Sequence, residues 1–175
     1  MFAWLQNRWC ALRGSYWLIP TLLVGSAFVA AQCTVALDDY WADSDALHWA
    51  YPGSPEGARA IIATIAAAVI NLVGVTFSIS VVALTMASAQ LGPRLLRMFL
   101  RDRANQVVLG FLLGTFVFAL LALRSISQAT GQATSLTVSV TFVLGVASLG
   151  FLIFFIHNTT SALQADQVVA AVAKD

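Results

Sequence analysis

Long runs of apolar residues without charge alternate with shorter polar segments along the chain. The longest uncharged run lies between Arg59 and Arg94, and another lies between Arg13 and Asp38. A helix needs about 20 mostly apolar residues to cross the hydrocarbon core of a bilayer. These runs therefore predict transmembrane helices, which we place at residues 17–37, 61–91, 107–123 and 136–156.

The segments between these spans have their own patterns. In residues 1–16, apolar side chains recur every three to four positions, which predicts an amphipathic helix lying in the membrane interface. Residues 92–106 open with Gly92-Pro93 and read as a basic amphipathic segment at a membrane face. The other segments are predicted to be an acidic external loop at 38–60, a short external loop at 124–135 and a tail at 157–175.

The first apolar run also allows a second interpretation. Arg8 and Arg13 precede it, and the small residues Val29-Ala30-Ala31 satisfy the rule for a signal-peptide cleavage site. The apolar run continues past that site, which favours a retained membrane helix.

The spans together predict an all-α, polytopic integral membrane protein with four transmembrane helices. In lipid only helices and closed β-barrels satisfy every backbone hydrogen bond, and these runs are too long and too continuously apolar for barrel strands. Composition agrees, because 59% of residues are hydrophobic and 10% are charged, where soluble domains have about 25% charged residues. A soluble monomer is thereby excluded.

The charges are distributed unequally between the two predicted membrane faces. Arg59 and Arg124 fall on the side of the acidic loop. The other basic residues fall on the opposite side: Arg8, Arg13, Arg94, Arg97, Arg101, Arg103 and Lys174. Because Lys and Arg concentrate in cytoplasmic loops, both termini are predicted to be cytoplasmic.

The second span carries a polar stripe in an otherwise apolar helix. Its members fall near one face of the helix: Asn71, Gly74, Ser78, Thr85 and Ser88. Small and hydroxyl residues let membrane helices pack closely, so the stripe is either a packing seam or the lining of a pore or substrate cavity. The absence of an ionisable residue from the predicted spans favours packing.

Two further patterns predict contacts. The arginines of the basic segment are expected to contact anionic lipid headgroups, in addition to marking the cytoplasmic side: Arg94, Arg97, Arg101 and Arg103. Gly110 and Gly114 have the GxxxG spacing that permits close packing of helices. The net charge is only +1, and the bilayer is expected to cover the apolar side of the basic segment. The protein is therefore not expected to bind nucleic acid.

The sequence offers no chemistry for catalysis. It has no Ser/His/Asp set, carboxylate pair or phosphate-binding glycine loop, and Asp43 and Asp45 lack the Gly and Glu of a calcium-binding EF-hand. Cys10 precedes the first predicted span and Cys33 lies near its far end, so the two are too far apart for a disulfide and are expected to be free thiols. No catalytic residue, metal site or cofactor is predicted.

A resemblance to a known family rests on a run in the middle of the chain. The residues GVTFSISVVALTMASAQLGPRLLRMFLRDRANQVVLGFLLGTFVFALLALRSI, with PEGARAII before them and SLTVSVTFVLGVASLGFLIFFIH after, resemble the bacterial membrane proteins known as domain of unknown function 2254. The match covers roughly residues 55–166. It implies a protein of the bacterial cytoplasmic (inner) membrane. Members of that family usually carry a soluble domain after the fourth helix, and this sequence departs from that pattern because it ends at Asp175.

Two classes of function are consistent with these patterns. One is a homo-oligomeric channel or transport component lined by the polar stripe. The other is a membrane anchor or assembly module that presents a cytoplasmic partner or domain. They differ in whether Asn71 and Ser78 face an open cavity or a neighbouring helix in the assembled state.

Overall fold

The computed structural model describes residues 18–41, 53–91, 103–128 and 135–172. These residues form four α-helices: α2 (Leu18–Trp41), α3 (Pro55–Leu91), α5 (Arg103–Gln128) and α6 (Ser135–Val172). Within this part of the chain, all four helices are long and apolar enough to cross a membrane. Their apolar spans are Leu18–Tyr40, Pro55–Thr85, Arg103–Ile126 and Ser135–Thr160. The predicted all-α fold with four membrane spans is confirmed, whereas residues 1–16 and most of the basic segment lie outside the described residues.

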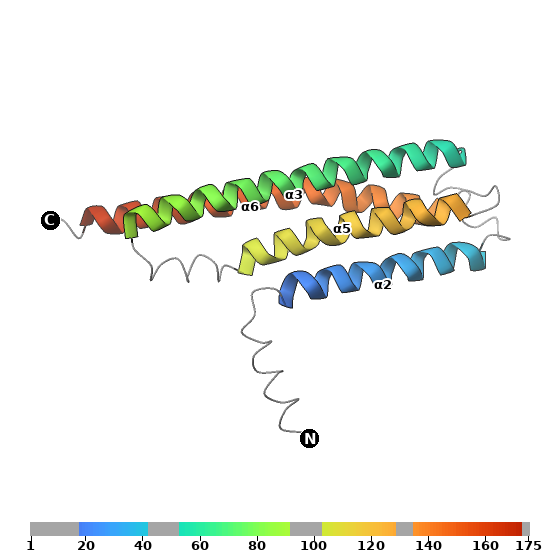
Figure 1. Ribbon diagram of the computed structural model, residues 1–175, viewed down its shortest axis with the longest axis horizontal. Helices are drawn as coiled ribbons and strands as arrows, with labels where there is room; N and C mark the ends of the chain where they lie inside the picture. Colours follow the sequence, from blue (N-terminus) through green and yellow to red (C-terminus); the bar gives the residue numbers. More distant parts are fainter. Residues whose placement is uncertain (1–17, 42–52, 92–102, 129–134, 173–175) are drawn as a thin grey trace, which may run out of the picture.

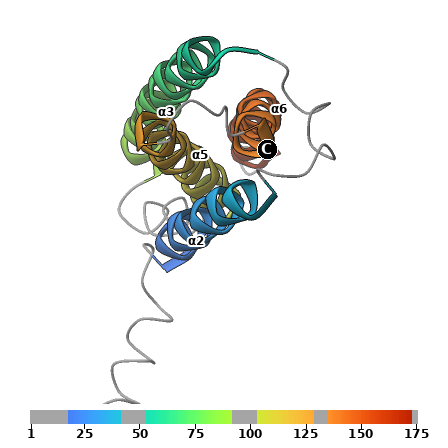
Figure 2. The same ribbon diagram turned by 90° about the vertical axis from the view of Figure 1, so that its right-hand side faces the viewer.

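Helix α5 is the centre of the bundle. It lies between α2 and α3, and α6 lies against one side of these three helices (Figure 2). In the most apolar stretch of α5, 44% of the residues are buried, against 11 to 22% in the other three helices. Helices α2 and α5 run in one direction, and α3 and α6 run in the other (Figure 1).

The two ends of the bundle are built differently (Figure 1). At the Asp38 end, α2 and α5 finish while α3 and α6 begin. At the opposite end, called the Arg103 end, α2 and α5 begin, and α3 and α6 continue past them. The difference follows from helix length, because α3 has 37 residues and α6 has 38, against 24 in α2 and 26 in α5. At 1.5 Å per residue the two long helices measure about 55 Å, well beyond a core of about 30 Å.

Helix α3 begins at Pro55, six residues before the start predicted from the apolar run. Ser54 caps it: the Ser54 hydroxyl accepts a hydrogen bond from the Gly57 amide at 3.2 Å, and its carbonyl oxygen accepts one from the Ala58 amide at 3.0 Å. Pro55 suits the first helical position, and Glu56 places a negative charge near the positive end of the helix dipole. These polar residues define a helix start that hydrophobicity alone does not mark.

The other helices also extend beyond their predicted apolar spans. Helix α2 ends at Trp41 rather than at 37, so that Asp38 and Asp39 lie in its last turn. Helix α5 runs over 103–128 rather than 107–123, and α6 continues to Val172 rather than ending at 156. A helix can continue into water once its first turns are fixed, whereas an apolar run ends where the hydrocarbon ends.

Two apolar clusters form the core. One extends from the middle of the bundle to the Asp38 end and includes Ala58, Ile62, Phe118 and Val138. The other lies toward the Arg103 end: Val69, Val108, Leu112 and Phe155. Beside it the rings of Phe111 and Phe151 stack with centroids 4.1 Å apart, which joins α5 to α6. Because lipid is as apolar as these side chains, close packing rather than transfer from water holds such a core together.

Candidate functional site

The polar stripe of α3 faces away from the interior of the bundle. Asn71, Gly74, Ser78 and Thr85 are all exposed, and Ser88 lies where only the helix backbone is described. The buried side chains described in the same helix are Ala58, Ile62, Ala66, Val69, Thr76 and Ala83. At about 100° per residue the two sets lie on opposite faces of α3. Within one copy of the chain the stripe therefore faces mostly away from the other helices, although Ser78 lies at the edge of a cleft between α3 and α6.

Asn71 is the most polar member of this stripe and lies near the middle of the apolar span Pro55–Thr85. Its side chain is exposed and has no hydrogen-bonding partner among the described residues. Ser78 likewise lacks such a partner, whereas the Thr85 hydroxyl donates to the Val82 carbonyl oxygen at 2.8 Å. An amide without a partner in hydrocarbon costs several kcal/mol. Asn71 thus has the strongest requirement in this stripe for a polar neighbour.

A second polar face of α3 turns inward and meets α5. The Ser80 hydroxyl lies 2.8 Å from the Thr76 carbonyl oxygen and 3.4 Å from Oδ1 of Asn105 on α5. Thr76 is fully buried, and its hydroxyl has no partner among the described residues. Thr76 and Ser80 lie on a different face of α3 from the stripe, and the structure turns that face, not the stripe, toward α5.

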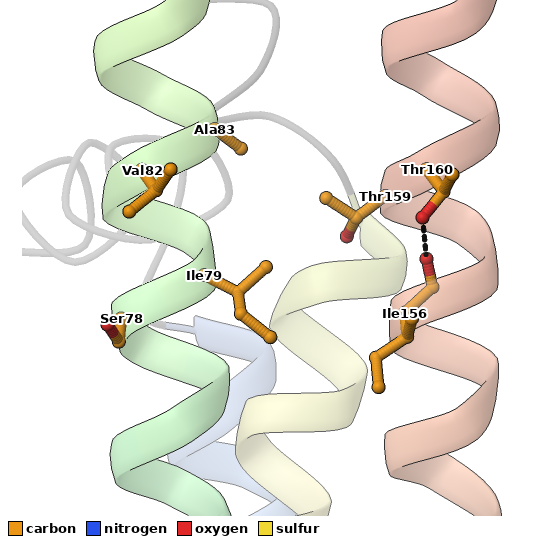
Figure 3. Close-up of a pocket in the computed structure, with 7 residues that line it drawn as sticks. All are labelled: Ser78, Ile79, Val82, Ala83, Ile156, Thr159 and Thr160. Atoms are coloured by element: carbon orange, nitrogen blue, oxygen red, sulfur yellow. Dashed lines mark hydrogen bonds between the residues drawn. The ribbon is translucent and has the colours of Figure 1, made fainter.

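A cleft opens between α3 and α6 near the Arg103 end (Figure 3). Its volume is about 220 Å³. It is lined by residues of the two helices: Ser78, Ile79, Val82, Ala83, Ile156, Thr159 and Thr160. All of them lie in the last turns of the apolar spans that end at Thr85 and Thr160, so the cleft lies where both apolar spans end.

Ile79 and Thr159 point into the space between the two helices, whereas Ser78 points away from α6 (Figure 3). The Thr160 hydroxyl donates to the carbonyl oxygen of Ile156 at 2.8 Å. Thr159 is only 9% exposed, and its hydroxyl has no partner among the described residues. The sequence does not distinguish Thr159, because a threonine beside His157 and Asn158 at a helix end gives no signal of burial.

At the Asp38 end, a carboxylate of α2 caps the start of α6. Oδ1 of Asp38 accepts a hydrogen bond from the Leu136 amide at 3.0 Å. Oδ2 accepts bonds from the Thr137 amide at 2.9 Å and from the Thr137 hydroxyl at 2.5 Å. An acidic residue in the last turn of a helix opposes the helix dipole, but here the charge lies against the positive end of α6. Asp38 is thus a structural link between α2 and α6, a role that the sequence did not indicate.

The GxxxG pair of α5 lies against α2 within one copy of the chain. A Cβ atom added at Gly110 would lie 2.8 Å from both the Leu23 Cδ1 and the Pro20 Cα, and one at Gly114 would lie 3.2 Å from the Ala27 Cβ. Gly145 makes a similar approach between α6 and α3, where an added Cβ would lie 2.9 Å from the Ile65 Cγ2. At Gly110 and Gly114 the missing side chain lets the backbones of α5 and α2 approach closely, and at Gly145 it leaves room for the Ile65 side chain.

The predicted lipid-contacting arginines fall mostly outside the described residues: Arg94, Arg97 and Arg101. Arg103 begins α5 and is exposed at the Arg103 end of the bundle. Cys33 is an exposed free thiol. Among the residues that the structure describes, no group of three His, Cys, Asp or Glu side chains could hold a metal ion.

The sequence matches the family described as predicted membrane protein (DUF2254) over residues 13–175. Two curated relatives are uncharacterized protein Rv1290c of Mycobacterium tuberculosis and uncharacterized protein Mb1321c of Mycobacterium bovis. Each is 34% identical over 168 residues, which cover 92% of this chain and 31% of the relative. The chain thus spans about a third of the length of these relatives. No solved structure matches the chain.

Neither the family nor these relatives has a description that indicates an enzyme. The match covers nearly the whole chain and includes all four packed, membrane-spanning helices. This multi-pass membrane protein therefore belongs to the DUF2254 family of predicted membrane proteins.

Proposed function

We propose that this chain is a membrane anchor and assembly module, which holds one helix projecting from the membrane to present a partner or a further domain. The observation that supports this function best is the length of α6. The helix continues past its apolar span, from Thr160 to Val172, for about 12 residues or ~18 Å at 1.5 Å per residue. Its continuation reads SALQADQVVAAV, in which four polar residues, one of them the charged Asp166, stand among eight apolar ones.

The packing of the bundle suits an anchor. Asp38 fixes the start of α6, the stacked Phe111 and Phe151 join it to α5, and Gly145 fits against Ile65 of α3. A helix held along its membrane span transmits its position to the part outside. In the relatives, most of the chain lies outside the matched 31%, a proportion that fits an anchor joined to a larger remainder.

A homo-oligomeric channel or transport component is the second candidate, and Asn71 is the observation that favours it. Its unpartnered amide faces away from the bundle near the middle of the membrane span. In an assembly of several copies, that face could meet another helix or line a shared conduit. We favour the anchor because Asn71 requires only one polar neighbour. Packing of the stripe against a helix of another copy would supply that neighbour without a conduit.

Ion flux separates the two functions. We expect purified protein in liposomes to give no flux above the lipid background for a panel of small ions, both as wild type and as Asn71→Leu. In an anchor the substitution changes only helix association, by ~1 kcal/mol or less, because hydrogen bonds between membrane helices are individually modest. Flux that Asn71→Leu alters in protein that still assembles would establish a channel and contradict the anchor.

The orientation that we propose places the Arg103 end of the bundle in the cytoplasm of a bacterial inner membrane. It follows from the excess of arginine in residues 92–103 over the other loops. In a background without native cysteines, an impermeant maleimide applied to intact cells should label Ser54→Cys and leave Arg103→Cys unlabelled until the cells are opened. Labelling of Arg103→Cys from outside would reverse the orientation.

A further inference from the structure

We propose that the cleft between α3 and α6 binds a membrane phospholipid, with an acyl chain in its apolar part and an ester carbonyl oxygen accepting a hydrogen bond from Thr159. This binding site is independent of whether the protein is an anchor or a channel. It rests on the cleft, on its depth in the membrane and on the unpartnered hydroxyl inside it.

The polarity of the cleft changes along the helix axes in the same order as the polarity of a phospholipid changes from its acyl chains to its headgroup. On α6, Ile156 lies deeper in the membrane, and Thr159 and Thr160 lie nearer its surface. On α3, Ile79 packs against the core cluster of Val69, Val108, Leu112 and Phe155 and forms an apolar floor. An amphipathic molecule with a hydrocarbon part below and polar oxygens above matches this order.

Thr159 specifies what the polar part of the occupant must offer. Thr160, the next residue, already donates to a backbone carbonyl of its own helix, but Thr159 does not and is instead aimed across the cleft (Figure 3). A side chain that is 9% exposed reaches little bulk water. Its hydroxyl faces the cleft, where an acceptor atom of an occupant can complete the hydrogen bonding of this largely enclosed side chain. The ester oxygens of a phospholipid lie just below the headgroups, at the depth of Thr159, and accept hydrogen bonds.

The size of the cleft favours part of a lipid over a complete small solute. Its volume of about 220 Å³ is below the ~300–1,000 Å³ of pockets that enclose drug-sized ligands. It is also several times the ~30 Å³ that one water molecule occupies in the liquid. Because the cleft is open, the remainder of the occupant can extend into the bilayer, and the headgroup can extend toward the exposed Arg103 at the start of α5.

The test measures phospholipid retained by the intact protein. Purified protein is titrated with palmitoyl-oleoyl phosphatidylglycerol in detergent, and native mass spectrometry gives the affinity of the tightest lipid. Thr159→Val keeps the shape of the side chain and should lower that affinity roughly fivefold, the effect of one ordinary hydrogen bond. Val82→Trp places an indole at the mouth of the cleft and should lower the affinity by a factor on the order of ten, as the loss of an acyl-chain contact would.

Two control variants on α3 make the same kinds of substitution outside the cleft. Thr64→Val removes an exposed hydroxyl that bonds only to the Ala60 carbonyl oxygen, and Val81→Trp adds an indole at the exposed position next to Val82. Both should bind lipid like wild type. Circular dichroism and size-exclusion elution establish that every variant is folded.

Three results would overturn the proposal. The first is unchanged lipid affinity in both folded cleft variants. The second is an equal loss in the controls, which would place the retained lipid elsewhere on the helices. The third is a change of oligomeric state in Val82→Trp with lipid affinity preserved, which would make a second copy of the chain the occupant.

Discussion

Gly110→Leu is expected to separate α2 from α5 and to destabilise the whole bundle. A Cβ atom alone at this position would lie 2.8 Å from the Pro20 Cα, and a backbone atom cannot move aside as the end of a side chain can. Larger side chains at such contacts cost about 1–3 kcal/mol in soluble cores, and occasionally more. Because α5 contacts each of the other helices, we expect a cost of about 3 kcal/mol, the upper end of that range.

The measurement is thermal unfolding in detergent. At each temperature, size-exclusion chromatography gives the fraction of protein that still elutes as a folded monomer or assembly. A cost of ~3 kcal/mol corresponds to a midpoint lowered by about 6–12 °C for a chain of this size. Gly74→Leu is the matched control, since it adds the same atoms to a membrane helix where nothing lies within 4 Å of the new Cβ. If both variants unfold at the same temperature, the close α2–α5 contact does not exist in the membrane-embedded protein.

The sequence predicted the number and type of the helices because apolar length is a physical requirement of the bilayer. It did not predict which helix lies at the centre. The longest span, α3, has a mean apolar character similar to that of α5, yet α5 is the most buried helix. Apolar side chains suit lipid and protein equally, so hydropathy cannot distinguish a helix surrounded by helices from one that faces lipid.

The same physics limits the candidate sites. The spacing of Asn71, Gly74 and Ser78 showed that they share a face, but not whether that face turns inward. The burial of Thr76 and Ala83 shows that the opposite face of α3 turns inward. Their residue types alone do not reveal that burial. Thr159 becomes a candidate only through Ile79, which lies opposite it on another helix. Contacts between helices depend on the rotation of each helix about its axis and on the register between helices. Neither can be read from the residue pattern of a single sequence.

Asp38 is the clearest example, because its partners are 98 and 99 residues away in the sequence. Read alone, Asp38-Asp39 after an apolar run marks the end of a membrane span, and the sequence placed both residues in a solvated loop. In the structure Asp39 is exposed, whereas Asp38 is partly buried and bonds to α6. Two adjacent residues of one type thus have different roles, which makes them a matched pair for experiment.

Asp38→Ala is expected to release the start of α6 from α2. The substitution leaves the Leu136 and Thr137 amides without acceptors and removes a negative charge from the positive end of a helix. An ordinary N-cap contributes about 1 kcal/mol, and a hydrogen bond to a charged group contributes about 1.5–3 kcal/mol. We expect the stability of the start of α6 to fall by about 2–3 kcal/mol, more than the contribution of one cap and less than the sum of the separate hydrogen bonds. The loss is below that sum because water at a membrane surface can partly replace the lost acceptor.

Hydrogen exchange measures this loss where it occurs. If local opening controls exchange, a loss of 2–3 kcal/mol speeds the Leu136 and Thr137 amides by roughly 30- to 150-fold, at 1.4 kcal/mol for each factor of ten. Asp39→Ala removes the same group one residue away and should leave both amides unchanged. Thr137→Val removes only the hydroxyl contact and should give a smaller effect than Asp38→Ala, since both backbone amides keep their acceptor. Equal protection in Asp38→Ala and Asp39→Ala would mean that another group caps α6, and α2 would then be held to α6 by apolar packing alone.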